Sequence, residues 1–267
     1  MKDIVRQVVN VLATIGVIVV NGLANALPLN GLTTGEISDR FDVYFVPAGY
    51  VFSIWGLIYL ALIGFSIYQA LPSQRENPRL QRIGYLYALS CLANVAWLFC
   101  WHYELFELTL VAMLALLLLL IALYLRLGIG RTLVSTGENW LLRVPFSIYL
   151  GWITVATIAN VTSLLDYLNW DGWGIEPALW AVIMIGIATV LTTLMSLIRA
   201  DVAYVAVIVW AFVGITVKHS GTAVVSYTAA GAAVFVALTL LLGVPLYRKR
   251  RAGLPDERYP APVTDRW

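Results

Sequence analysis

The sequence predicts an all-α membrane protein, a polytopic bundle of eight transmembrane helices. Of its 267 residues, 61% are hydrophobic and 12% are charged, whereas a soluble domain carries about 25% charged residues. So few charges could not cover a soluble surface. The composition therefore excludes a cytosolic globular enzyme, a disordered chain and a nucleic-acid-binding protein.

Eight apolar stretches have about the length that a membrane-spanning helix needs, roughly 20 residues. They run over Ile4–Leu27, Ala48–Ala70, Arg82–Trp101, Leu105–Leu125, Val144–Leu165, Pro177–Ile198, Val202–Val217 and Thr222–Tyr247. The seventh is the shortest. The first is longer than the apolar core of a signal peptide, so we expect it to be retained as a helix.

The basic residues support this count and give the orientation. Cytoplasmic segments of membrane proteins accumulate Lys and Arg. With eight helices, only Arg40 and Lys218 of the 17 basic residues fall on the side away from the two termini. We therefore expect a multi-pass protein of the cell inner (cytoplasmic) membrane with both termini in the cytoplasm.

The predicted membrane interior lacks ionisable side chains, because no Asp, Glu, Lys or Arg lies in the middle of any stretch. Such residues usually mark ion pathways, proton relays and voltage sensors. Their absence argues against a pump, a proton-coupled transporter and a voltage-gated channel. The chain also carries no hydrolytic triad, HExxH, CxxC or phosphate-binding glycine loop, so we predict no catalytic residues and do not expect an enzyme.

Aromatic and amide side chains recur at helical spacing on four stretches, which places each set on one helix face. The sets are Asn21 and Asn25; Phe52, Trp55 and Tyr59; Asn94, Trp97 and Trp101; and Tyr149, Trp152 and Asn160. The helix directions put most of them in the outer half of the membrane. The loop 28–47 lies on the same side and would act as a lid.

Two simpler interpretations of these residues stay open. Trp and Tyr near helix ends, such as Trp101 and Trp170, commonly form an interfacial belt. Asn94 and Asn160 would equally serve as hydrogen-bonding residues between helices. The histidines His102 and His219 lie at outer helix ends, where a solvated side chain is a better interpretation than a metal ligand. We therefore predict no metal site and keep the two histidines as weak candidates.

Three short motifs resemble the TspO/MBR family, the tryptophan-rich sensory or translocator proteins. The first is the segment from Pro47 through Trp55 to Tyr59, the second is Asn94 with Trp97, and the third is Pro145, Trp152 and Asn160. They cover the first five helices in order. The resemblance divides the chain into a TspO-like five-helix bundle (1–167), three additional transmembrane helices (168–247) and a basic, proline-containing cytoplasmic tail (248–267).

The resemblance implies a binding or sensory protein with a pocket closed by the first loop. Its ligand would be a tetrapyrrole (a porphyrin, haem or a chlorophyll-type pigment) or another flat hydrophobic molecule, with no cofactor required and a link to pigment or photosynthesis regulation. The predicted ligand-binding residues are Pro47, Tyr50, Phe52, Trp55, Tyr59, Asn94, Trp97, Tyr149, Trp152 and Asn160.

Two other functions remain as alternatives. The last three helices are rich in Ala, Gly and Thr, and small residues allow helices to pack closely. This composition also fits an accessory subunit of a larger, pigment-bearing membrane complex. A facilitator of small apolar solutes is the other alternative. The expected partners are membrane lipids, a hydrophobic small molecule and other membrane-protein subunits, with no nucleic acid.

Overall fold

The computed structural model describes residues 2–27 and 29–256, with the side chains of Asn25 and Arg251 left out, so residues 257–267 of the predicted tail lie outside it. Within this part the fold is all-α, as predicted, and contains no sheet. The long helices are α1 (Lys2–Ala26), α3 (Ile54–Ala70), α5 (Leu86–His102), α6 (Phe106–Arg126), α8 (Val144–Tyr167), α9 (Pro177–Leu194), α10 (Val202–Lys218) and α11 (Ala223–Arg250).

Each predicted apolar stretch overlaps one of these helices. Among the described residues, six helical segments are long and apolar enough to cross a membrane, whereas α5 and α10 are shorter, at 17 residues each. The shorter elements are η1 (Leu29–Gly31), α2 (Thr34–Ser38), η2 (Gly49–Ser53), η3 (Pro72–Gln74), α4 (Pro78–Ile83), α7 (Thr136–Glu138), η4 (Asn139–Arg143), η5 (Gly172–Gly174), η6 (Met195–Arg199) and η7 (Arg251–Gly253).

The predicted start of the third stretch at Arg82 is wrong. Arg82 belongs to α4, and Gly84 separates this helix from α5. The backbone of Gly84 has φ 53° and ψ −121°, a conformation open to glycine but costly for other residues. The chain therefore turns sharply before α5 begins at Leu86.

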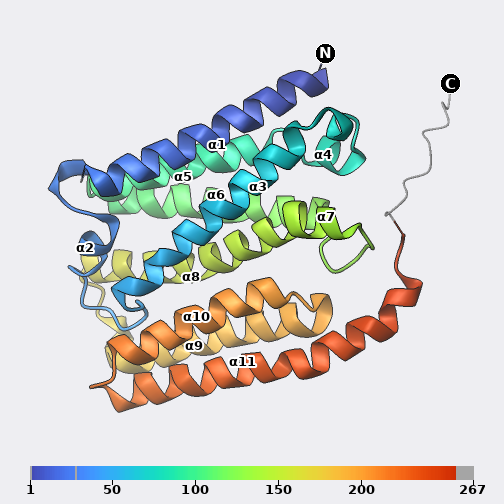
Figure 1. Ribbon diagram of the computed structural model, residues 1–267. Coiled ribbons are helices and arrows are strands. Elements are labelled where there is room, and N and C mark those ends of the chain that lie inside the picture. The colour runs from blue at the N-terminus through green and yellow to red at the C-terminus, as the bar shows by residue number, and fades with distance from the viewer. Residues whose placement is uncertain (1, 28, 257–267) are drawn as a thin grey trace.

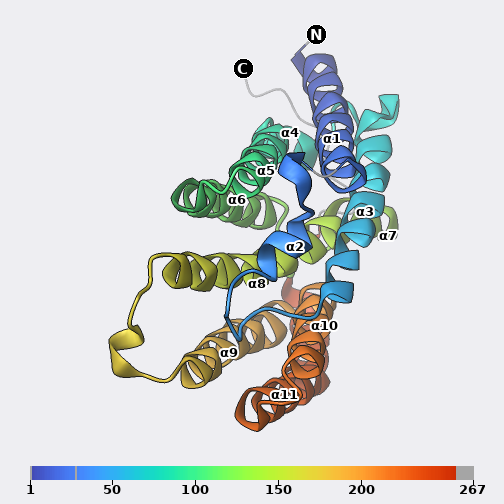
Figure 2. The ribbon, with the colours of Figure 1, turned by 90° about the vertical axis from the view of Figure 1, so that its left-hand side faces the viewer.

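The helices form two packed groups that meet at α8 (Figures 1 and 2). Helix α5 lies between α1 and α6, and α6 packs on α8. Helix α10 contacts α8 on one side and α11 on the other, which joins the last three helices to the first five. The start of α1 and the end of α11 lie at the same end of the bundle, as an even number of passes requires.

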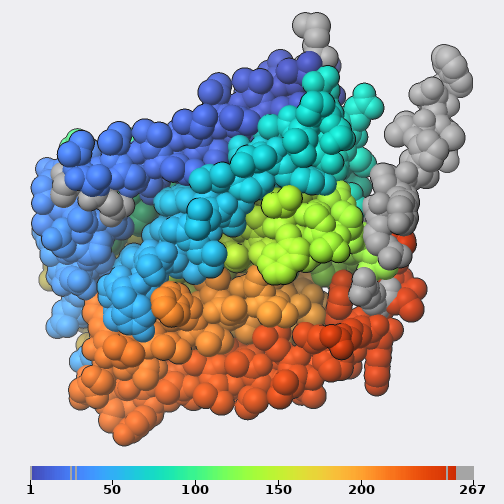
Figure 3. Space-filling model, in the orientation of Figure 1, coloured from blue at the N-terminus to red at the C-terminus, as the bar shows by residue number. Residues whose placement is uncertain are grey.

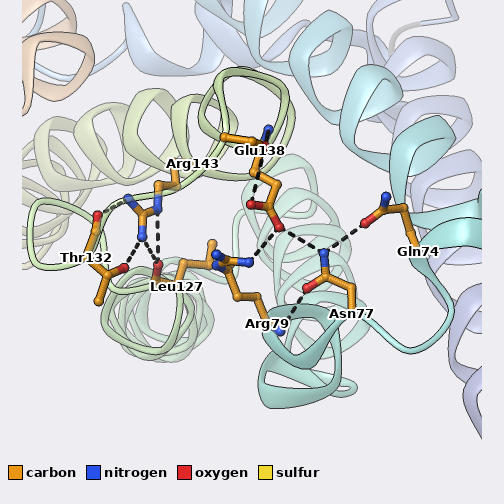
Figure 4. A network of polar contacts seen from close by, with 8 residues as sticks. Gln74, Asn77, Arg79, Leu127, Thr132, Glu138 and Arg143 are labelled. Atoms are coloured by element: carbon orange, nitrogen blue, oxygen red, sulfur yellow. Dashed lines mark hydrogen bonds and ion pairs between the residues drawn. The ribbon is translucent and has the colours of Figure 1, made fainter. Parts of the chain in front are cut away.

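A polar network fixes the end of the bundle where the arginines gather (Figure 4). Arg79 Nη1 lies 2.7 Å from Glu138 Oε1, and the two side chains are only 3% and 7% exposed. Asn77 Nδ2 donates to the same oxygen at 2.9 Å. Nearby, Arg143 donates to the backbone oxygens of Leu127 and Thr132. These bonds hold α4, the chain after α6 and the start of α8 together.

Candidate ligand-binding site

A cavity of about 50 Å³ lies under α2, between α3, α5 and α8. Six of the predicted ligand-binding residues line it: Pro47, Phe52, Trp55, Trp97, Trp152 and Asn160. Thr34 and Ser38 of α2 form one wall of the cavity. Ala156 and Ala159 of α8 form another, and their small side chains leave the space open. We call this the aromatic cavity.

Three predicted residues lie behind the wall of this cavity. The Tyr59 ring stacks on Trp55 with centroids 5.6 Å apart, and the Tyr149 ring meets Trp55 edge-on at 5.9 Å. Asn94 Nδ2 donates to the Tyr149 hydroxyl at 3.0 Å, and Asn94 Oδ1 accepts from Asn21 at 2.9 Å. These residues therefore hold Trp55 in place and tie α1, α5 and α8 together.

Two indole groups on the cavity wall are unusual. The side chains of Trp97 and Trp152 are buried, at 7% and 3% exposed, and neither Nε1–H has a hydrogen-bond partner among the described residues. A buried donor without a partner costs about 1–3 kcal/mol. Both residues line the same cavity, and an acceptor that reached either N–H would relieve this cost.

Asn160 lines the cavity and also bonds to a neighbouring helix. Its Nδ2 donates to Thr109 Oγ1 of α6 at 3.1 Å. The sequence leaves an interhelical hydrogen-bonding role open for Asn94 and Asn160. In this structure both side chains make hydrogen bonds to neighbouring helices. Of the two predicted ligand-binding amides, Asn160 lines the cavity and Asn94 does not.

The loop that covers the cavity is fixed to the end of α5. Trp101 Nε1 donates to the backbone oxygen of Thr34 at 3.2 Å. The His102 ring lies 3.2 Å from Thr34 Oγ1 through Nε2 and 3.1 Å from the Leu29 oxygen through Nδ1. Trp101 and His102 lie at the end of α5 as expected, but the exposed side chains expected of an interfacial belt residue and a solvated histidine are wrong. Both are buried, at 4% and 1% exposed, because α2 folds over this end of α5.

The same loop is fixed on its other side to α10. Ala48 N donates to the backbone oxygen of Gly214 at 3.1 Å, and Lys218 Nζ lies 2.7 Å from Asp39 Oδ1. The two segments also touch where Trp210 packs edge-on against Tyr50, which lies outside the cavity, half-exposed. Nothing in the local sequence signals these contacts, since they join segments far apart in the chain. The segment Leu29–Val51, here called the lid, is thus held between α5 and α10.

The two histidines contact oxygen atoms of the lid, the segment that covers the aromatic cavity. Both ring nitrogens of His102 face oxygen atoms of the lid, and His219 Nε2 lies 3.2 Å from the Val46 oxygen. Within the described ranges, no three His, Cys, Asp or Glu side chains are close enough to hold an ion.

A family model described as TSPO-like protein matches residues 7–242. The chain belongs to the TSPO-like family. The match runs past Tyr167, so it includes the three C-terminal helices that the five-helix motifs do not cover. No curated protein and no solved structure is significantly similar to the chain. As a TSPO-like chain with several helices able to span a bilayer, it is a multi-pass membrane protein in contact with lipids.

We expect His219 to make the stability of this TSPO-like protein depend on pH. Burial disfavours the charged imidazolium, and this lowers the pKa of His219 from its ordinary value of about 6.5. The folded state then binds fewer protons than the unfolded state, so stability is lost as the pH falls through that value. The thermal midpoint should drop between about pH 7.5 and pH 5.5. An equal drop in His219→Gln would contradict this origin.

Proposed function

We propose that this TSPO-like protein binds a flat hydrophobic ligand of the tetrapyrrole class in the aromatic cavity. The observation that carries the proposal is the pair of buried, unpartnered indole N–H groups of Trp97 and Trp152 on an aromatic wall. Flat rings offer apolar area to a flat ligand, and a few polar groups orient it. The carboxylate or carbonyl oxygens of a porphyrin would supply the acceptors that the two indoles lack.

Binding of such a ligand requires the lid to move. The cavity measures about 50 Å³, whereas pockets for drug-sized ligands measure about 300–1,000 Å³. The lid is fixed at its surface by two ion pairs with exposed members, Lys218–Asp39 and Arg40–Glu104. Exposed pairs each contribute only about 0–1 kcal/mol, so the main cost of lifting the lid is the loss of its buried contacts, such as the hydrogen bonds of Thr34 with Trp101 and His102.

The contacts of α10 with the lid support a role for this helix in this step. We propose that residues 1–167 form the ligand-binding bundle and that α10, from the part 168–247, holds the lid closed through Gly214, Lys218 and His219. The basic end of α11 and the following tail, from residue 248, would lie in the cytoplasm, with the protein in the inner membrane. Ligand binding would then change how the lid meets α10, which is the kind of change that a sensory protein needs.

Titration with protoporphyrin IX tests the proposal. Trp97→Phe and Trp152→Phe keep an aromatic ring but remove the N–H donor, and one hydrogen bond contributes about 0.5–1.5 kcal/mol. Each variant should therefore weaken binding by about 2–12-fold. The porphyrin absorbance should be followed, because substitution alters the tryptophan fluorescence itself.

Trp173→Phe is the matched control, because Trp173 is 75% exposed and does not line the aromatic cavity. It should bind like the unmodified protein. Absence of saturable binding would overturn the proposal, and so would an unchanged affinity in both Trp97→Phe and Trp152→Phe.

A further inference from the structure

A second and larger cavity, of about 810 Å³, lies between α3, α8 and α10, with Tyr247 of α11 at its edge. Helices α3 and α10 diverge across the surface of α8 on the face shown in Figure 3, which leaves a wedge-shaped space open to the side of the bundle. Its walls are apolar along most of their length, with Leu57, Ile148 and Ala206 among them. We call it the lateral cavity.

The narrow end of the lateral cavity is closed where η2, just before α3, meets α10. There Trp210 Nε1 donates to the backbone oxygen of Val51 at 3.2 Å, and Ser53 and Trp210 both line the cavity. The helices separate toward the end of the bundle where the arginines gather. The space is therefore apolar and narrow at one end, and wide and polar at the other.

The polar end carries charged side chains. Arg143, Arg199 and Asp201 line it. The Asp201 carboxylate already accepts hydrogen bonds from the Tyr124 hydroxyl at 2.8 Å, the Ser147 hydroxyl at 2.7 Å and the Tyr204 N–H at 3.1 Å. Its charge is thus compensated inside the protein.

Arg199 has N–H donors that make no hydrogen bond within the described residues. Its Nη1 donates to the backbone oxygen of Ile129 at 2.9 Å, and the guanidinium lies 5.7 Å from the centre of the Tyr124 ring. Arginine carries five N–H donors, and within residues 2–27 and 29–256 the others have no hydrogen-bond partner. A half-buried cation with unused donors at the mouth of an apolar space favours an anionic group on an apolar molecule.

We propose that the lateral cavity is a binding site for an anionic phospholipid. One acyl chain would lie between α3 and α10, and the phosphate would accept from Arg199 at the wide end. Basic pockets between transmembrane helices are a recognised form of lipid headgroup site. The sideways opening gives a lipid direct access from the bilayer. The site does not depend on the aromatic cavity, with which it shares no lining residue.

Native mass spectrometry of the purified full chain tests this proposal. The protein is exchanged into detergent with equal amounts of phosphatidylglycerol and phosphatidylcholine, and the lipids that stay bound are counted. We expect at least a fivefold preference for phosphatidylglycerol. Arg199→Gln should bring this ratio close to one, and Ala206→Trp or Leu57→Trp should reduce retention of both lipids by filling the space.

Two matched controls make the same chemical changes outside the lateral cavity. Arg126→Gln removes an exposed arginine at the end of α6, and Ala115→Trp adds an indole to an exposed position of the same helix; both should retain lipid normally. Equal retention of the two lipids by the unmodified protein would overturn the proposal. It would also fall if Arg199→Gln kept the preference, or if inorganic phosphate alone displaced the lipid, which would indicate a site for free phosphate.

Discussion

Glu138→Ala should lower the free energy of unfolding by about 3–5 kcal/mol, the cost of removing one partner from a buried ion pair. The Glu138 carboxylate accepts hydrogen bonds from Arg79 Nη1 at 2.7 Å and from Asn77 Nδ2 at 2.9 Å. Both members of the Arg79–Glu138 pair are almost completely buried. In the Glu138→Ala protein, the buried Arg79 guanidinium loses this carboxylate. Unfolding in mixed micelles with increasing SDS measures the difference.

A control and a rescue separate this effect from the loss of any acidic side chain. Glu107 is exposed on α6, so Glu107→Ala should change stability by less than about 0.5 kcal/mol. The double substitution Arg79→Met with Glu138→Leu removes both charges together, and a well-packed apolar pair often restores the stability of a buried ion pair. A Glu138→Ala protein as stable as Glu107→Ala would show that the network contributes nothing.

This ion pair marks a limit of prediction from the sequence. The long helices follow from hydropathy because each depends on the composition of its own stretch. Arg79 and Glu138 lie in two different connections between predicted helices, and charged residues in connections are normally solvated. Their burial depends on α4 and α7 folding back onto the bundle. Neither short helix has a hydrophobic pattern long enough to be recognised.

Part of the candidate site could likewise be predicted from the sequence, and part could not. Helical spacing places Trp55, Trp97 and Trp152 on faces that meet, and all three do line the aromatic cavity. Spacing alone does not show which amides face a cavity and which face a helix, so Asn94 lies behind the wall. The contacts of the lid with α10 could not be predicted, because they depend on backbone atoms and on how two distant segments are packed.

Gly214→Ala should disturb the closed lid more than any other single methyl group added to α10. A Cβ atom at this position would lie 2.2 Å from Val51 Cγ2 and 2.9 Å from Pro47 Cβ. Val51 is fully buried and has one side-chain torsion, so it cannot turn aside. Overpacking of this kind costs about 1–3 kcal/mol. The strain is relieved if the segment from Pro47 to Val51 moves away from α10.

This displacement should affect both the stability of the protein and the access of a ligand to the aromatic cavity. A lid pushed off α10 loses the hydrogen bond from Ala48 N to the Gly214 oxygen, so the closed state is the one that the substitution destabilises. Gly214→Ala should therefore unfold at a lower temperature yet take up protoporphyrin IX faster in stopped-flow absorbance. Gly231→Ala is the control, because a Cβ there meets no atom within 4 Å and alanine favours a helix. Slower uptake by Gly214→Ala than by Gly231→Ala would show that α10 does not hold the lid closed.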